Sequence, residues 1–261
     1  MIADYHMHTS FSDDSTYPME NAITRSISLG LDEICFTEHV DYGVKTDLNC
    51  NYNAYINEFQ RCREKYKNRI AMKLGIEFGM QIHTIEQFQK DFCKYDFDFV
   101  ILSCHQVDNK EFWTQDFQRG KTQREYNEAY YHEILKVIRA YDDYSVLGHL
   151  DMIKRYDKAG IYPFEKAKQI VAEILEHVIS HGKGIEVNTS CFRYGLKDLT
   201  PSKEILNLYK ELGGTIITIG SDAHEEKDVG CNISLVKKEL REMGFKKFCT
   251  FEKMKPIFHD L

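Results

Sequence analysis

The chain begins with the stretch IADYHMH at residues 2–8, a short run that ends in two histidines, His6 and His8. Its length and its apolar residues are typical of a buried β-strand. Alternate side chains of an extended strand point to the same side, so both imidazoles are expected on one face. The stretch therefore predicts a strand whose C-terminal end presents two potential metal ligands.

Six more short runs of this kind follow along the chain, and amphipathic segments of helical length separate them. The seven expected strands are Ile2–His6, Glu33–Thr37, Met72–Glu77, Phe97–Ser103, Ser145–His149, Gly184–Asn188 and Thr215–Gly220. Such alternation is typical of parallel strands covered by helices. Because 261 residues suit one barrel of this kind, we expect an α/β fold with a single (β/α) barrel domain over residues 1–261.

Prolines and glycines mark where the expected helices begin and end. Pro18, Pro163 and Pro201 each lie near a predicted first turn, where a missing N–H costs nothing. The segment Phe164–His181 has apolar residues at helical spacing and stops at Gly182. These signals support helices between the strands.

The segment Asp108–Glu125 has no clear period and contains the only tryptophan, Trp113. We expect a long loop after the fourth strand. Loops of this length are often lids or binding loops, but an insertion without a function is equally compatible with the sequence.

The composition excludes several classes of protein. Hydrophobic residues make up 43% of the chain and charged residues 29%, as in ordinary globular proteins. The formal net charge of −7 argues against a protein that coats nucleic acid, which needs a surplus of lysine and arginine. The sequence shows neither an apolar run of membrane-spanning length nor an export signal in residues 1–10. We therefore expect a cytoplasmic protein that acts on a small molecule and binds neither a nucleic-acid polymer nor a membrane.

The eight cysteines do not indicate a disulfide framework. Cys35 and Cys104 lie inside predicted strands, and the chain has no Cys-x-x-Cys pair. Without an export signal, reduced thiols are expected. Cys191 falls on the expected active-site face, where a packing role is the simpler interpretation.

Histidines and carboxylates follow the predicted strands one after another, at the ends that form the catalytic face of a barrel. A single residue of this kind is a weak indication, because a lone buried histidine is usually a hydrogen-bonded core residue. Nine such residues after six of the seven strands are a strong indication of a metal site, since burying them together without cations would be costly. The candidate metal ligands are His6, His8, Asp13, His39, Glu77, His105, His149, Asp222 and His224.

The other five histidines do not belong to this group. His177 and His181 are spaced i,i+4 and could chelate a metal, but they end the helix before the sixth strand, at the opposite end of the barrel. A histidine near a helix C-terminus is also favoured by the helix dipole. His83, His132 and His259 have no partners at telling spacings.

The motifs at the strand ends resemble those of the PHP (polymerase and histidinol phosphatase) superfamily, and the resemblance spans the chain. They are His6-x-His8, Ser12-Asp13, Thr37-Glu38-His39, Gly75-Ile76-Glu77 and Ser221-Asp222-Ala223-His224. Within that superfamily, the monofunctional histidinol-phosphate phosphatases are similar at Gly148-His149-Leu150-Asp151, Lys154-Arg155-Tyr156 and Glu186-Val187-Asn188-Thr189-Ser190. Cys191 departs from the pattern, because a small glycine is expected there.

The resemblance implies a distorted seven-stranded barrel, TIM-like and of the PHP type, that holds two to three divalent metal ions. It places His6, His8, Glu77 and Asp222 on one metal, Asp13, His39 and His224 on a second, and His105 and His149 on a third, with Glu77 shared. It also implies hydrolysis of histidinol phosphate to histidinol and phosphate, a step of histidine biosynthesis. We expect Glu77, His39 and Asp222 to be essential for catalysis.

Hydrolysis of a phosphate monoester requires cations that neutralise its oxygens and activate a water as a metal-bound hydroxide. Ligands of this kind fit zinc, iron or manganese better than magnesium or calcium. Arg155 and Arg193 follow the fifth and sixth strands and could hold the phosphate, with Lys154 as a weaker candidate. Glu252 is a candidate partner for the amine of the substrate. Surface salt bridges are the alternative role for these residues.

Three other functions remain open. A PHP-type phosphoesterase could act on nucleotides or another small phosphate ester with the same metals. An amidohydrolase also begins with His-x-His, but it usually has a lysine after the fourth strand, where this chain has His105. A non-catalytic metal-binding barrel is the third possibility, and the full set of ligands argues against it.

Overall fold

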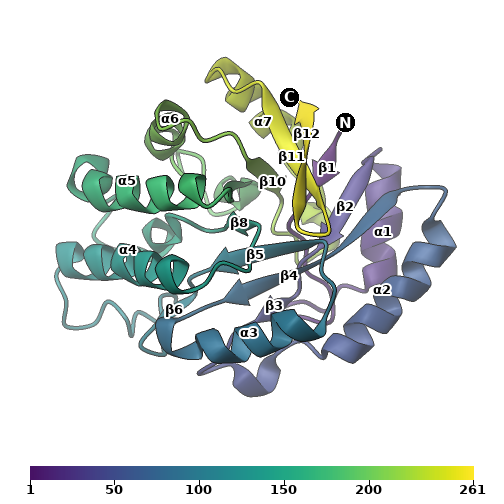
Figure 1. The fold of residues 1–261 in the computed structure, drawn as a ribbon, viewed down its shortest axis with the longest axis horizontal. Helices are drawn as coiled ribbons and strands as arrows, with labels where there is room; N and C mark the ends of the chain where they lie inside the picture. Colours follow the sequence, from purple (N-terminus) through teal and green to yellow (C-terminus); the bar gives the residue numbers. More distant parts are fainter.

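The computed structural model describes residues 1–261 and has a parallel sheet that curls into a barrel, with helices packed around it (Figure 1). The strands of the barrel follow the order β1 (Ala3–Asp4), β2 (Glu33–Phe36), β4 (Ala71–Gly79), β5 (Phe99–Ser103), β8 (Val146–Leu147), β9 (Gly184–Asn188) and β10 (Ile217–Gly220). All of these pairings are parallel. Each strand overlaps one of the seven expected from the sequence, so the predicted α/β barrel is confirmed.

The barrel closes where β1 meets β10, the first and last strands of the path. Tyr5 N–H donates to the carbonyl of Ile219 at 3.0 Å, and Asp222 N–H donates to that of His6 at 2.7 Å. Beyond the strands, His8 N–H donates to the carbonyl of Ala223 at 2.8 Å. These bonds bring residues from the two ends of the sequence side by side at the C-terminal end of the barrel.

Seven helices cover the outside of the sheet (Figure 1). They are α1 (Met19–Ser28), α2 (Tyr52–Tyr66), α3 (Ile85–Lys94), α4 (Gln123–Ala140), α5 (Phe164–Ser180), α6 (Lys203–Glu211) and α7 (Ile233–Glu242). Pro18 and Pro163 are the residues directly before α1 and α5, as predicted. Pro201 precedes Ser202, whose hydroxyl accepts the N–H of Ile205 and so caps α6. None of the helices combines the length and the apolar character that a membrane span requires.

A hairpin that the sequence reading missed lies at the N-terminal end of the barrel. It consists of β11 (Lys247–Glu252) and β12 (Lys255–Asp260). The hydroxyl of Tyr5, in the barrel interior, accepts the N–H of Phe251 at 2.9 Å. Met254 N–H donates to the carbonyl of Asp98, which precedes β5, at 2.9 Å. The hairpin therefore packs against the end of the barrel opposite the histidines.

The expectation of a long irregular loop over Asp108–Glu125 is only partly correct. Its first residues are the turn and second strand of an antiparallel hairpin of β6 (Gln106–Val107) and β7 (Lys110–Glu111). Asp108 and Asn109 connect these strands at φ 52° and 56°, the conformation of a two-residue hairpin turn. The segment ends in a helix, because Thr122 accepts the N–H of Glu125 and caps α4.

All eight cysteines are free thiols, in agreement with the sequence. Cys191 is buried directly after β9, in the short helix Thr189–Cys191, so its role is packing.

We predict that Gly220→Ala destabilises the closure of the barrel. A Cβ at this position would lie 2.2 Å from the Cβ of His6 and 2.7 Å from Oε1 of Glu186. Overpacking of this severity costs roughly 3 kcal/mol. Urea unfolding should show a loss of that size for Gly220→Ala, but only about 1 kcal/mol for Gly120→Ala. A Cβ at Gly120 meets nothing within 4 Å, and only its φ of 76° opposes alanine. Equal losses in the two variants would contradict this account of the seam.

Candidate active site

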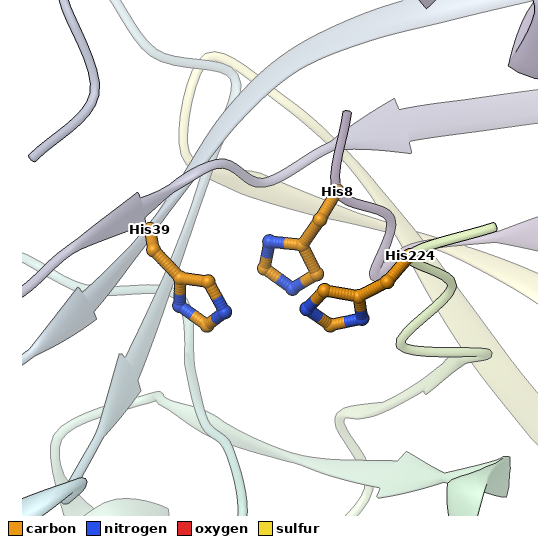
Figure 2. A group of neighbouring side chains, drawn as sticks. All are labelled: His8, His39 and His224. Atoms are coloured by element: carbon orange, nitrogen blue, oxygen red, sulfur yellow. The ribbon is translucent and has the colours of Figure 1, made fainter. Parts of the chain in front are cut away.

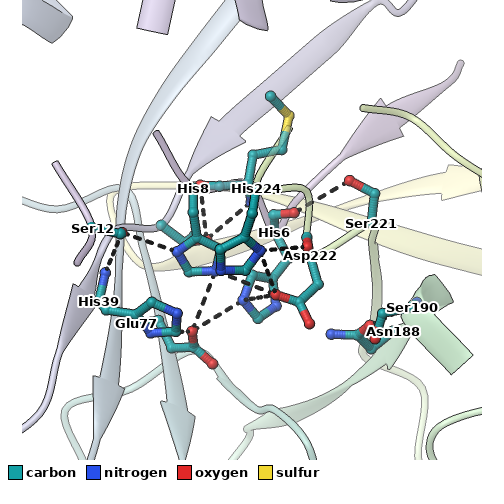
Figure 3. Close-up of polar contacts among 12 residues, drawn as sticks. His6, His8, Ser12, His39, Glu77, Asn188, Ser190, Ser221, Asp222 and His224 are labelled. Carbon is teal, nitrogen blue, oxygen red and sulfur yellow. Dashed lines mark hydrogen bonds and ion pairs between the residues drawn. The ribbon is translucent and has the colours of Figure 1, made fainter. Parts of the chain in front are cut away.

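The carboxylate of Glu77 is surrounded by imidazoles at the C-terminal mouth of the barrel; Figure 3 shows it beside His39 and His6. Its Oε2 is 3.1 Å from Nε2 of His6 and 3.1 Å from Nδ1 of His39. Its Oε1 is 3.1 Å from Nε2 of His149 and 3.3 Å from Nε2 of His105. The carboxylate is buried. One side chain on β4 thus contacts histidines that come from four other places in the barrel.

Asp222 and the remaining histidines complete the group. Asp222 Oδ1 lies 3.5 Å from Nε2 of His8 and 3.7 Å from Nδ1 of His224. The rings of His8 and His39 stack with centroids 4.0 Å apart, and those of His8 and His224 at 4.3 Å. Figure 2 shows the three rings facing one another. The structure therefore brings together eight of the nine predicted candidates: His6, His8, His39, Glu77, His105, His149, Asp222 and His224.

The ninth candidate, Asp13, faces elsewhere, and its neighbour Asp14 takes the expected place. Asp14 Oδ1 is 3.2 Å from Nε2 of His224, and its Oδ2 is 3.6 Å from Nε2 of His39. Asp13 pairs instead with Lys45, Oδ2 to Nζ, at 2.8 Å. Both residues lie in a turn, where a shift of one position reverses the direction of a side chain. The structure thus corrects the predicted carboxylate from Asp13 to Asp14.

The cluster fits divalent cations. Four of its buried ring nitrogens form no hydrogen bond, although two of them lie close to carboxylate oxygens: Nε2 of His8, Nδ1 of His39, Nδ1 of His149 and Nε2 of His224. Buried polar atoms without partners are costly, and a cation among them would remove part of that cost. Three-membered sets of ligand atoms within 4.8 Å of one another occur repeatedly across the cluster. The mixture of imidazole and carboxylate suits zinc, iron or manganese.

Carboxylates behind the cluster orient two of the imidazoles. Nδ1 of His6 is 2.5 Å from Oε1 of Glu186, and Nδ1 of His105 is 2.9 Å from Oδ1 of Asp41. Each Nδ1 carries the proton in such a bond, so Nε2, which faces Glu77, is the nitrogen that would ligate a cation. The sequence reading gave neither carboxylate a role. A charged residue inside the buried strand β9 was the available signal for Glu186, and Asp41 follows His39 at strand spacing.

Ser12 and Glu38 orient His8 in the same way. The hydroxyl of Ser12 donates to Oε2 of Glu38 at 2.6 Å, so its oxygen is left to accept. It lies 3.2 Å from Nδ1 of His8 and accepts the N–H of His39 at 3.0 Å. His8 Nδ1 must then be the protonated nitrogen, and its Nε2 lone pair faces Asp222 and Glu77.

The electrostatics of the cluster depend on the balance between burial and charge. Burial opposes ionisation of Glu77, but the surrounding histidines outweigh it and hold the pKa well below the ordinary value. Burial also disfavours the charged form of His105, yet Asp41 and Glu77 raise its pKa to about 10. For His224 burial is likewise outweighed, by Asp14 and Asp222, and the pKa rises to about 9. Without cations the site therefore retains protons on these imidazoles at neutral pH.

A cavity of about 280 Å³ opens above the cluster. Its walls include Trp113, Tyr156, Tyr194 and Arg155. The Arg155 guanidinium lies 3.8 Å from the centroid of the Tyr194 ring, and its Nη2 donates to the hydroxyl of Ser190 at 2.7 Å. Arg155 is thus held against the wall of the cavity.

Arg193 also lies near Tyr194, with its guanidinium 5.5 Å from the ring centroid. Its Nη2 donates to the carbonyl of Asp222 at 2.8 Å, and its Nη1 to that of Ser221 at 3.3 Å. The Nη2 atoms of both arginines lie 3.9 Å from Oδ2 of Asp222. Two cationic side chains therefore lie beside the candidate ligands, as the sequence predicted.

The two other predicted substrate contacts do not face the cavity. Lys154 donates from Nζ to Oδ2 of Asp151 at 2.6 Å and to the carbonyl of Leu199 at 2.5 Å. Glu252 belongs to β11 at the far end of the barrel, where its Oε2 is 3.8 Å from Nζ of Lys73. The structure thus corrects both expectations: Lys154 ties the chain behind Arg155 to a neighbouring loop, and Glu252 is remote from the histidines.

A parallel barrel with histidines and carboxylates at its C-terminal mouth defines the class of metal-dependent hydrolases. A family model described as PHP domain matches residues 4–190. A histidinol-phosphatase of Lactococcus lactis subsp. lactis (strain IL1403) is 34% identical over 263 residues, which cover 97% of this chain and 95% of the relative. A probable histidinol-phosphatase of Clostridium acetobutylicum is 30% identical, covering 100% of this chain and 97% of the relative. The chain therefore belongs to the PHP family.

A solved structure agrees with this assignment. The crystal structure of histidinol phosphate phosphatase from Lactococcus lactis, in complex with zinc, L-histidinol and phosphate, matches with a TM-score of 0.89 at 32% sequence identity. The match covers 98% of both chains. The fold is thus shared from end to end.

The position of Asp14 generates a prediction that separates it from its neighbour. Asp14→Asn should lower turnover by at least about 100-fold and lower the metal content, because the carboxylate beside His39 and His224 loses its charge. Asp13→Asn, the matched control, should keep the metal content of the wild type. Elemental analysis and phosphate release measure the two effects. A larger loss in Asp13→Asn would reverse the assignment.

The raised pKa values of His105 and His224 predict that metal loading releases protons. Both imidazoles carry protons at pH 7 in the metal-free protein, and ligation requires their removal. Titrating the metal-free protein with zinc in an indicator dye should show more protons released per chain at pH 7 than at pH 9.5, where His224 is already mostly neutral. A release that does not change over this interval would show that these imidazoles are neutral before binding.

Proposed function

We propose that this protein is a metal-dependent phosphomonoesterase that hydrolyses L-histidinol phosphate to L-histidinol and phosphate. The observation that carries the proposal is the meeting of a buried histidine and carboxylate cluster with two arginines at one mouth. The end-to-end similarity to histidinol-phosphatases, one of them crystallised with zinc, L-histidinol and phosphate, supports the choice of substrate.

The cluster would hold two to three divalent ions, zinc, iron or manganese. The distances support a division into three sets, of which the first and third share Glu77: His6, His8, Glu77 and Asp222; Asp14, His39 and His224; His105 and His149 with Glu77. Bound cations supply charge neutralisation for the phosphate oxygens and a nucleophile at neutral pH. Glu77, His39 and Asp222 are the residues on which this arrangement most depends.

Arg155 and Arg193 would bind the phosphate group. A guanidinium presents a planar set of donors that matches phosphate oxygens. The Arg155 side chain is almost fully buried, and its stacking on Tyr194 fixes the plane of the guanidinium before substrate arrives. Arg193 is likewise fixed by two backbone carbonyls. Little side-chain entropy is then lost on binding.

The outer part of the cavity suits the organic half of histidinol phosphate. Trp113 and Tyr156 meet edge to face with ring centroids 6.2 Å apart, and Tyr194 lies on the same wall. Flat rings of this kind can contact an imidazole. Asp41, which is outside the proposed metal ligands, also lines the cavity and gives it negative charge that favours an ammonium group.

A PHP-type phosphoesterase that acts on nucleotides is the second candidate. The same cluster would support that reaction, but a cavity of about 280 Å³ is at the small end for ligand sites and favours the smaller ester.

The proposal predicts that the metal-loaded protein hydrolyses histidinol phosphate with kcat/KM at least about tenfold above that for any mononucleotide, because its cavity is shaped for the smaller leaving group. Glu77→Ala should retain less than about 0.1% of this activity, since the shared ligand of the cluster is lost. Phosphate release by protein of verified metal content provides the measurement.

Glu252→Ala is the matched control for Glu77→Ala. It also removes a glutamate, but at the other end of the barrel, and it should keep wild-type activity. A clear preference for a nucleotide would overturn the substrate, and an active Glu77→Ala protein that contains its metals would overturn the mechanism.

A further inference from the structure

A second group of potential metal ligands lies far from the mouth. His177 and His181 occupy the last turn of α5 and the residue that follows it, and Asp142 lies in the connection between α4 and β8. One ligand atom from each of the three residues lies within 4.8 Å of the others. The end of α5 leads into the start of β9, so the group is at the N-terminal end of the barrel, opposite the active site.

Backbone carbonyls orient both imidazoles of this group. Nε2 of His177 lies 2.7 Å from the carbonyl of Ile138, which is among the last carbonyls of α4 and has no partner within its own helix. Nδ1 of His181 lies 2.9 Å from the carbonyl of His177. A carbonyl can only accept, so each of these nitrogens carries the proton. Nδ1 of His177 and Nε2 of His181 therefore keep free lone pairs.

This pattern is that of metal-binding histidines, which donate one ring N–H to a carbonyl or carboxylate and ligate through the other nitrogen. The rings of His177 and His181 are stacked with centroids 3.9 Å apart, an arrangement that two protonated imidazoles would oppose. The Asp142 carboxylate forms no ion pair and no side-chain hydrogen bond, and is exposed to solvent. Two imidazoles and one free carboxylate thus converge from two segments of the chain.

We propose that Asp142, His177 and His181 form a peripheral site for a divalent transition metal of the zinc class, separate from the catalytic cluster. Imidazole nitrogens select zinc, nickel or copper over magnesium and calcium, and the carboxylate adds the charge that balances the cation. Three protein ligands leave further positions for water. A metal there would link the end of α5 to the segment that enters β8, so its role is to stabilise this end of the barrel.

The test uses the holoenzyme, dialysed against buffer of fixed free zinc concentration, and compares wild type with His181→Ala. His132→Ala is the matched control, because His132 is exposed on α4 and belongs to neither group of ligands. Elemental analysis should find one more zinc per chain in wild type and His132→Ala than in His181→Ala, with equal phosphatase activity in all three. Equal zinc in the three proteins would overturn the proposal.

Thermal unfolding gives a second readout that does not depend on turnover. At a free zinc concentration 100 times the dissociation constant, the added stability corresponds to a rise in Tm of about 5 °C. The rise should occur in wild type and His132→Ala. It should be absent from His181→Ala and from Asp142→Asn, an exposed substitution that removes only charge. The same rise in all four proteins would mean that the zinc acts at the catalytic cluster alone.

Discussion

The structure depends on one buried carboxylate, Glu77, held among five imidazoles. A fully buried charge is expensive unless it is paired, and here the pairing comes from histidines that lie on, or shortly after, other strands. The register of the sheet makes this possible: β3 (His39–Val40) places His39 directly beside Glu77, and β5 lies along the opposite edge of β4. Ser103, at the end of β5, donates its hydroxyl to Oε1 at 2.6 Å. The position of Glu77 is thus determined by strand pairing and not by a flexible loop.

The glycines on β4 show how closely the neighbouring side chains approach this strand. A Cβ at Gly79 would lie 1.8 Å from Oδ1 of Asp41 and 2.6 Å from Nδ1 of His105. A Cβ at Gly75 would lie 2.6 Å from Sγ of Cys35. The glycines two residues before and after Glu77 therefore leave room for the groups that surround and orient its partners. The same close approach recurs at Gly220, where the barrel closes beside His6.

The sequence predicted the features that recur along the chain, which are the strands and the residues at their ends. It missed features that depend on the direction or the partner of a single side chain. Seven apolar runs were enough to predict the parallel barrel. The residues at the strand ends were enough to predict eight members of the cluster, because the C-terminal ends of the parallel strands of a barrel lie together. The choice between Asp13 and Asp14 depends on the direction of side chains in one turn, which has no periodic signal. Lys154 and Glu252 carry the charges expected of residues that bind the phosphate and the amine of the substrate. Their side chains instead contact the carbonyl of Leu199 and the side chain of Lys73, which lie about 45 and 180 residues away in the chain. The carboxylates behind the imidazoles were missed for the same reason, since only the fold shows which histidine each contacts.

The conformation that the mouth needs for catalysis lowers the stability of this end of the barrel. His149 and Asp222 adopt positive φ values of 49° and 56°, conformations that cost energy for residues other than glycine. Both follow the ends of strands, and their side chains reach the cluster, His149 beside Glu77 and Asp222 beside His8. The site also contains carboxylates close together and ring nitrogens without partners, which further destabilise it in the absence of cations. The seam between β1 and β10, the packed helices and the hairpin at the far end must supply the stability that the mouth lacks. Since metal binding relieves these costs only in the folded chain, occupation of the cluster stabilises the same conformation that catalysis requires.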